Sequence, residues 1–151
     1  QDSTANNHDL TDNNTVLSES GKISRAALFD ADNSESLSMS DHADVSLNNT
    51  SFTISFWFRP QDEGVDYPIV CKRSDNDLTA SSGNEYTVWM YQSGPARYFR
   101  LDVGSTLSIV SGPLNLIGST VYGFGAVVYD KPEGKYHFYY YPGFGLLSAA
   151  L

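Results

Sequence analysis

The segment SFTISFWFRPQ, residues 51–61, constrains the fold more strongly than any other part of the chain. β-Branched and aromatic residues fill it, and these residue types favour β-strands. Pro60 ends the run, because proline has no N–H group to donate to a sheet. Side chains alternate between the two faces of a strand, so this pattern predicts a β-strand with one apolar, buried face. That face carries Phe52, Ile54, Phe56 and Phe58.

Short runs of similar composition recur along the chain, separated by glycine, proline, asparagine and aspartate. No segment has the apolar spacing of an amphipathic helix of useful length. The chain has 151 residues, of which 40% are hydrophobic, and this is enough for one domain with its own core. The pattern predicts an all-β, antiparallel sandwich. The expected strands cover residues 26–29, 36–39, 52–59, 69–73, 86–92, 98–103, 107–110, 121–129 and 135–141.

Five segments, in this order, carry a resemblance to a known family. They are GKISRAALFD at residues 21–30, SFTISFW at 51–57, YPIVCKRSDND at 67–77, GNEYTVWMYQSG at 83–94 and VYGFGAVVYDKPEGKYHFYYYPG at 121–143. Together they resemble the laminin-G-like jelly-roll domains of the concanavalin A-like lectin/glucanase superfamily. The resemblance implies an antiparallel jelly-roll β-sandwich for residues 21–151, preceded by a polar arm or first edge segment at residues 1–20.

The C-terminal end of the chain departs from the family pattern. Family members continue after the last motif with further strands that close the sandwich. This chain stops at Leu151 with GFGLLSAAL, so we expect the sandwich to lack its last closing strands. An open sheet edge exposes unpaired backbone groups and invites another chain to pair with it. A neighbouring copy, or the rest of a larger chain, is therefore expected to cover Tyr139, Tyr141, Phe144, Leu146 and Leu147.

Charge and hydropathy argue against two classes of partner. The net charge is −9 and Lys plus Arg total only 9 residues, whereas binding to nucleic acid needs clustered basic side chains. No run approaches the roughly 20 apolar residues that span a membrane, so no membrane insertion is expected. Cys71 is the one cysteine, so no intrachain disulfide can form. With the family resemblance, these features indicate an extracellular protein, or one at a cell or particle surface.

The sequence does not indicate an enzyme. Glycan-hydrolysing relatives in the superfamily carry paired carboxylates in an E-x-D-x-x-E pattern on one strand, and this pattern is absent here. Nucleophilic catalysis by Cys71 would need a nearby histidine. The three histidines, His8, His42 and His137, are scattered along the sequence. We therefore expect a non-enzymatic protein.

Two polar segments carry the oxygen ligands that calcium prefers. HDLTDNN contributes Asp9, Asp12 and Asn14, and SDNDLTASSGNE contributes Asp75 and Asp77. The resemblance favours a calcium ion, because laminin-G-like folds often hold one near the rim of the sandwich. The alternative is that these side chains only stabilise turns in polar loops. Neither segment matches the EF-hand loop, so both interpretations stay open.

Aromatic residues on two neighbouring expected strands indicate where a sugar could bind. Sugars stack on exposed aromatic rings and exchange hydrogen bonds with polar side chains. Trp89 and Tyr91 share one face of their strand, and Tyr98 lies on the next strand with Arg97 and Arg100 nearby. The sequence therefore predicts ligand-binding residues Trp89, Tyr91, Tyr98 and Arg97. The alternative is that this face is part of the inner surface of the sandwich.

Two functional hypotheses follow. The leading one is a non-enzymatic extracellular binding or adhesion module that recognises a glycan or a protein through loops at the rim of the sandwich. The alternative is a structural subunit of a surface, phage or filament assembly, in which a neighbouring copy completes the sheet. The first depends on Trp89 and Tyr91, and the second on residues 143–151.

Overall fold

The computed structural model describes residues 5–47, 50–60, 66–74, 83–114, 122–141 and 145–149. The chain divides into two compact units, Gln1–His42 (unit 1) and Ala43–Leu151 (unit 2), each described here by itself. Every regular element in the described residues is a β-strand or a short 3₁₀ helix, and all strand pairs are antiparallel. The all-β prediction is therefore confirmed. Within these residues, no helix is long and apolar enough to cross a membrane.

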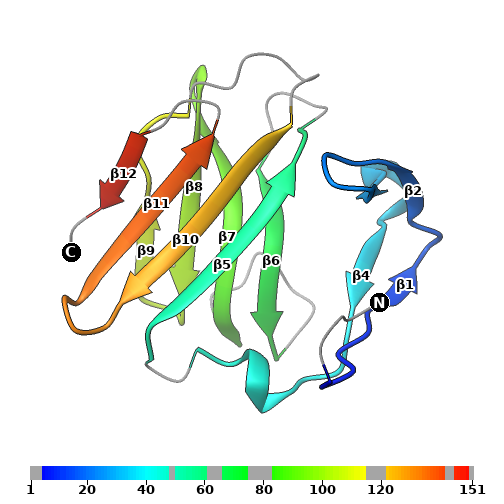
Figure 1. Ribbon diagram of the computed structural model, residues 1–151, viewed down its shortest axis with the longest axis horizontal. Helices are drawn as coiled ribbons and strands as arrows, with labels where there is room; N and C mark the ends of the chain where they lie inside the picture. Colours follow the sequence, from blue (N-terminus) through cyan, green and yellow to red (C-terminus); the bar gives the residue numbers. More distant parts are fainter. Residues whose placement is uncertain are drawn as a thin grey trace. The chain divides into compact units, whose positions relative to one another are not determined.

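Unit 2 consists of two four-stranded sheets, which Figure 1 shows one behind the other. A 3₁₀ helix, η2 (Ala43–Val45), precedes the first strand. Sheet I has the strand order β12-β11-β10-β5, and sheet II has the order β6-β7-β8-β9. The strands of sheet I are β5 (Phe52–Phe58), β10 (Gly123–Asp130), β11 (Lys135–Tyr141) and β12 (Gly145–Ala149). The strands of sheet II are β6 (Tyr67–Arg73), β7 (Asn84–Ser93), β8 (Ala96–Val103) and β9 (Leu107–Val110).

The core of unit 2 lies between the two sheets. Phe99 on β8 meets three aromatic rings of sheet I, with ring centroids 5.4 Å from Phe56, 5.6 Å from Phe58 and 6.3 Å from Tyr140. Alternate residues of every contributing strand point inward, as strand geometry requires. These contacts make unit 2 a β-sandwich, as predicted. The side chains with no exposed surface include Val88, Phe99, Leu101, Val127 and Phe138.

Two glycines on the central strand β10 make room for the aromatic core. A Cβ atom on Gly125 would lie 2.7 Å from the rings of both Phe56 and Phe99. A Cβ atom on Gly123 would lie 2.7 Å from the ring of Phe58. Glycine weakens a strand because it brings no side chain to pack. Here the missing side chains give the aromatic rings the space that they fill.

The C-terminal residues form part of sheet I. β12 pairs with β11 in antiparallel register, which places Leu146 opposite Tyr139 and Leu147 opposite Phe138. A neighbouring chain was expected to pair with this end of the sheet. The backbone of β12 instead pairs on one side with β11 of the same chain. β12 is still an edge strand, so its second side has no neighbour in the described sheet. The jelly-roll connectivity stays a prediction.

Unit 1 contains two separate two-stranded ribbons. β1 (Thr11–Asn13) pairs with β4 (Ser36–Ser38), and β2 (Leu17–Ser20) pairs with β3 (Arg25–Leu28). A 3₁₀ helix, η1 (Ala31–Asn33), precedes β4. The expected boundary after residue 20 falls within the β2–β3 ribbon, whereas the two units meet after His42. No described side chain of unit 1 is buried, and four large apolar side chains are more than half exposed: Leu10, Leu17, Ile23 and Phe29.

Candidate functional site

The outer surface of sheet II carries a compact group of aromatic and charged side chains. In the β7–β8 register, Trp89 lies opposite Arg100, and Tyr91 lies opposite Tyr98. Their neighbours along the two strands, such as Val88 and Phe99, are buried in the core, so this group faces away from it. The interpretation of this surface as inner is therefore wrong. We call the group the Trp89 face; it comprises Trp89, Tyr91, Tyr98, Arg100 and Asp102.

Arg100 organises the Trp89 face. Its guanidinium carbon lies 4.8 Å from the ring centroid of Trp89 and 5.0 Å from that of Tyr91. Its Nε atom lies 3.2 Å from Oδ2 of Asp102, and both charged side chains are about one fifth exposed. A cation over an aromatic face is attracted by the ring quadrupole. The Tyr98 ring lies 6.2 Å from Tyr91 and extends the aromatic surface.

The indole nitrogen of Trp89 gives this face a further polar group. Nε1 is buried and has no hydrogen-bond partner among the described residues. An indole N–H can only donate, so it needs an acceptor. A buried donor without one costs free energy. The Trp89 face thus combines apolar rings, a guanidinium, a carboxylate and an unsatisfied donor on one surface.

Arg97 does not belong to this face. Its side chain is buried on the opposite side of β8, where Nη1 lies 3.5 Å from the sulfur atom of Met90. Its carbonyl oxygen accepts a hydrogen bond of 2.7 Å from the amide of Leu114. Adjacent residues of a strand point to opposite faces, so Arg97 and Tyr98 cannot share one. Arg100 takes the position that was expected for Arg97.

A second aromatic surface lies on the outer side of sheet I. Trp57, Phe124 and Tyr141 lie in one row across β5, β10 and β11, and Tyr139 lies in the next row. The Trp57 and Phe124 ring centroids are 5.3 Å apart. Trp57, Tyr139 and Tyr141 are 40%, 41% and 44% exposed. We call these four residues the Trp57 face, which includes the two expected interface tyrosines; Phe144 lies outside the described residues.

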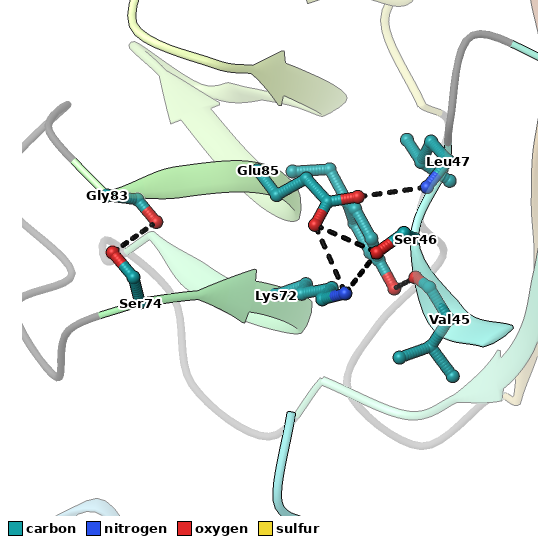
Figure 2. A network of polar contacts seen from close by, with 8 residues as sticks. Val45, Ser46, Leu47, Lys72, Ser74, Gly83 and Glu85 are labelled. Atoms are coloured by element: carbon teal, nitrogen blue, oxygen red, sulfur yellow. Dashed lines mark hydrogen bonds and ion pairs between the residues drawn. The ribbon is translucent and has the colours of Figure 1, made fainter. Parts of the chain in front are cut away.

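Glu85 is the centre of a polar cluster at the β6–β7 end of sheet II (Figure 2). Its Oε1 accepts a hydrogen bond of 2.9 Å from the amide of Leu47, and its Oε2 accepts one of 3.2 Å from Ser46 Oγ. Lys72 Nζ lies 3.1 Å from Oε2 and also donates to Ser46 Oγ. The neighbouring Tyr86 hydroxyl donates to the Val45 carbonyl at 3.0 Å. The cluster therefore fastens the segment after η2 to sheet II.

The same cluster places a serine beside a lysine, an arrangement that some hydrolases use for nucleophilic catalysis. In that chemistry the lysine must take the serine proton through a free lone pair. Here Lys72 makes an ion pair with Glu85, which is an interaction of the ammonium form. Ser46 also donates its own proton to Glu85. These contacts are those of a structural cluster, which holds residues 46–47 against sheet II.

Two of the expected calcium ligands of unit 1, Asp12 and Asn14, make hydrogen bonds to the backbone of this unit. Asp12 Oδ1 accepts a hydrogen bond of 2.8 Å from the amide of Val16. Asn14, with φ of 66°, donates its side-chain amide to the carbonyls of Asn33 and Ser34, both at 3.1 Å. In the described part of the chain, Asp9 and Asp12 belong to no group of three imidazole, thiolate or carboxylate side chains. Calcium binding stays a prediction; Asp75 and Asp77 lie outside the described residues.

Two histidines that are distant in the sequence meet in unit 1. The ring centroids of His8 and His42 lie 4.5 Å apart, with 54° between the ring planes. Their separation along the chain gave no signal of this contact, because it depends on how unit 1 folds. Imidazole nitrogens are common ligands of transition metals.

Comparisons with known proteins found no match for this chain. No protein-family model matches it, and neither the curated proteins nor the solved structures gave a match.

Proposed function

We propose that this chain is a non-enzymatic binding module that recognises a glycan on the Trp89 face. The observation that carries the proposal is the Arg100–Asp102 ion pair beside three half-buried aromatic rings on the outer surface of one sheet. A pyranose ring has apolar C–H patches and a rim of hydroxyl groups. Aromatic rings contact the patches, while a guanidinium and a carboxylate bind the hydroxyls as donor and acceptor. The resemblance to laminin-G-like domains supports an extracellular setting.

The carboxylates of unit 2 support a binding role over a hydrolytic one. Glycosidases need two carboxyl groups that face each other across the scissile bond. Five described carboxylates of unit 2 instead accept hydrogen bonds from backbone amides or pair with basic side chains. They belong to Asp66, Glu85, Asp102, Asp130 and Glu133.

A glycan array probed with the whole chain, followed by calorimetric titration of the best-bound glycan, tests the proposal. Trp89→Ala and Tyr98→Ala should each weaken binding at least tenfold, which corresponds to about 1.4 kcal/mol. Trp57→Ala is the matched control, because it removes an aromatic ring from the outer face of the other sheet. Unchanged binding by Trp89→Ala, or a loss confined to Trp57→Ala, would reject the Trp89 face as the site.

We propose a second function, assembly of a structural homo-oligomer, because the Trp57 face exposes three large aromatic side chains. Aromatic residues are enriched in protein interfaces, and lysine is depleted there. Tyr139→Lys combined with Tyr141→Lys should therefore dissociate any oligomer seen by native mass spectrometry. The Trp89→Ala variant should keep its oligomeric state. A wild-type chain that stays monomeric at all concentrations would contradict this second function.

A further inference from the structure

Unit 1 lacks the features that normally hold a small unit together. None of its described side chains is buried, and its two ribbons have only two strands each. Isolated two-stranded ribbons are marginally stable in water. Units of about 40 residues usually need a disulfide, a metal ion or a partner in addition to their core. The chain has one cysteine, so an intrachain disulfide is excluded.

The contact between His8 and His42 lies where such a link would be most effective. The two residues are near opposite ends of unit 1, so a bond between them would close most of its chain into a loop. Closing a long loop restricts the unfolded chain more than closing a short one. His8 is half-buried and His42 is exposed, so an ion in solution can reach the pair.

We propose that His8 and His42 bind a divalent transition-metal ion, with zinc as the best-fitting ion, and that this ion closes unit 1. One ligand nitrogen of each ring lies within 4.8 Å of the other. Two zinc–nitrogen bonds of about 2.0 Å at a tetrahedral centre separate the nitrogens by roughly 3.3 Å. Small side-chain rotations cover the difference. This site is independent of the glycan-binding function, because neither histidine belongs to the Trp89 face.

The ligand chemistry selects the metal. Imidazole nitrogen suits zinc, copper and nickel, whereas calcium and magnesium prefer oxygen ligands. Zinc also accepts water as a ligand, which can fill the positions that the two imidazoles leave open. The proposal therefore differs from the calcium site that the sequence predicts.

Calorimetric titration of the whole chain with zinc chloride, and separately with calcium chloride, tests the proposal. His8→Ala and His42→Ala should each weaken zinc binding at least tenfold. His137→Ala is the matched control, because His137 is the third histidine of the chain and lies on β11 of unit 2. It should bind zinc like the wild type. Equal zinc affinity in all four proteins, or no zinc binding by the wild type, would overturn the site.

Amide hydrogen exchange gives a second readout that separates a structural ion from weak surface binding. Zinc should slow exchange across residues 5–42 of the wild type and leave exchange in the His8→Ala variant unchanged. Calcium at the same concentration should have no such effect in either protein. Zinc that binds without slowing exchange in this range would overturn closure of unit 1 by the ion.

Discussion

Three contacts at the end of sheet II depend on the side chain of Glu85. It accepts hydrogen bonds from Leu47 and Ser46 and forms an ion pair with Lys72. Hydrogen bonds to charged groups contribute more than neutral ones, and removing one partner leaves the others unsatisfied. The carboxylate thus connects a backbone amide, a hydroxyl and an ammonium group of three different residues.

The substitution Glu85→Ala should lower the free energy of unfolding by about 2 kcal/mol. Urea denaturation measures this change. Glu133→Ala is the control, because its ion pair with Lys135 is more than half exposed and should contribute less than about 1 kcal/mol. Equal losses in the two variants would show that the Glu85 cluster is no stronger than a surface pair.

A methyl group on Gly125 should be more harmful than its size suggests. Its Cβ atom would lie 2.7 Å from two aromatic rings of a packed core. Gly125→Ala should therefore lower the free energy of unfolding by about 1–3 kcal/mol. Ser55→Ala on the neighbouring strand is the control, because Ser55 is exposed on the outer face. A Gly125→Ala protein as stable as the wild type in urea would mean that the rings shift freely.

Single residues also show where sequence reasoning succeeds and where it fails. Alternation along β7 correctly places Trp89 and Tyr91 on one face. The same rule excludes Arg97 from the face of Tyr98, and applying it strictly to β8 would have selected Arg100. The contact between His8 and His42 has no local signature, because residues far apart in the sequence meet only in the folded unit.

Among the elements, strands with strong apolar alternation were predicted most accurately. β9 and β11 have the expected bounds, and β5 ends one residue early. β1 was not predicted, and β2 was expected only as a short strand near Val16 and Leu17, because polar residues fill both segments and no apolar period marks them. Their pairing with β4 and β3 comes from unit 1 as a whole. Local pattern thus identifies strands with apolar alternation and misses polar ones such as β1 and β2.

Two buried tyrosines on the inner face of β11, Tyr136 and Tyr140, should lower the stability of the folded protein at alkaline pH. Burial raises the pKa of Tyr140 above its usual 10, and burial together with nearby Tyr129 raises the pKa of Tyr136. The folded chain then holds these protons more tightly than the unfolded chain does. Their contribution to stability is complete below about pH 10 and is lost as pH rises further.

Urea denaturation at a series of pH values should show a free energy of unfolding that falls above about pH 10. The variants Tyr136→Phe and Tyr140→Phe have no phenolic proton at these positions, so each should decline less steeply than the wild type. A wild-type curve that stays flat up to about pH 12 would contradict a raised pKa of Tyr136 and Tyr140.

For the whole molecule, the two units should differ in local stability. Unit 2 has a continuous core of buried side chains, whereas unit 1 has none among its described residues. Amide exchange follows local opening, which is rare where buried contacts are many. In metal-free buffer, amides of residues 11–38 should therefore exchange faster than those of β7, β8 and β10. Equal protection in the two units would show that the whole chain opens as one.

Composition and alternation were sufficient to predict an antiparallel all-β sandwich, because they report which faces are buried. They did not predict the division after His42, since unit 1 has turn-rich, polar segments that resemble an arm. The Trp89 face could be outlined from strand parity, but its ion pair and stacked guanidinium depend on hairpin register. Register is set by turn geometry and packing, which act between strands.

The close approach of Gly125 to Phe56 and Phe99 also has an evolutionary consequence. A larger residue at position 125 would crowd both rings, so the three positions should substitute together. A double variant, Gly125→Ala with Phe56→Leu, would relieve one of the two close contacts. Among homologous sequences, correlated change at these three positions would be the signature of this core.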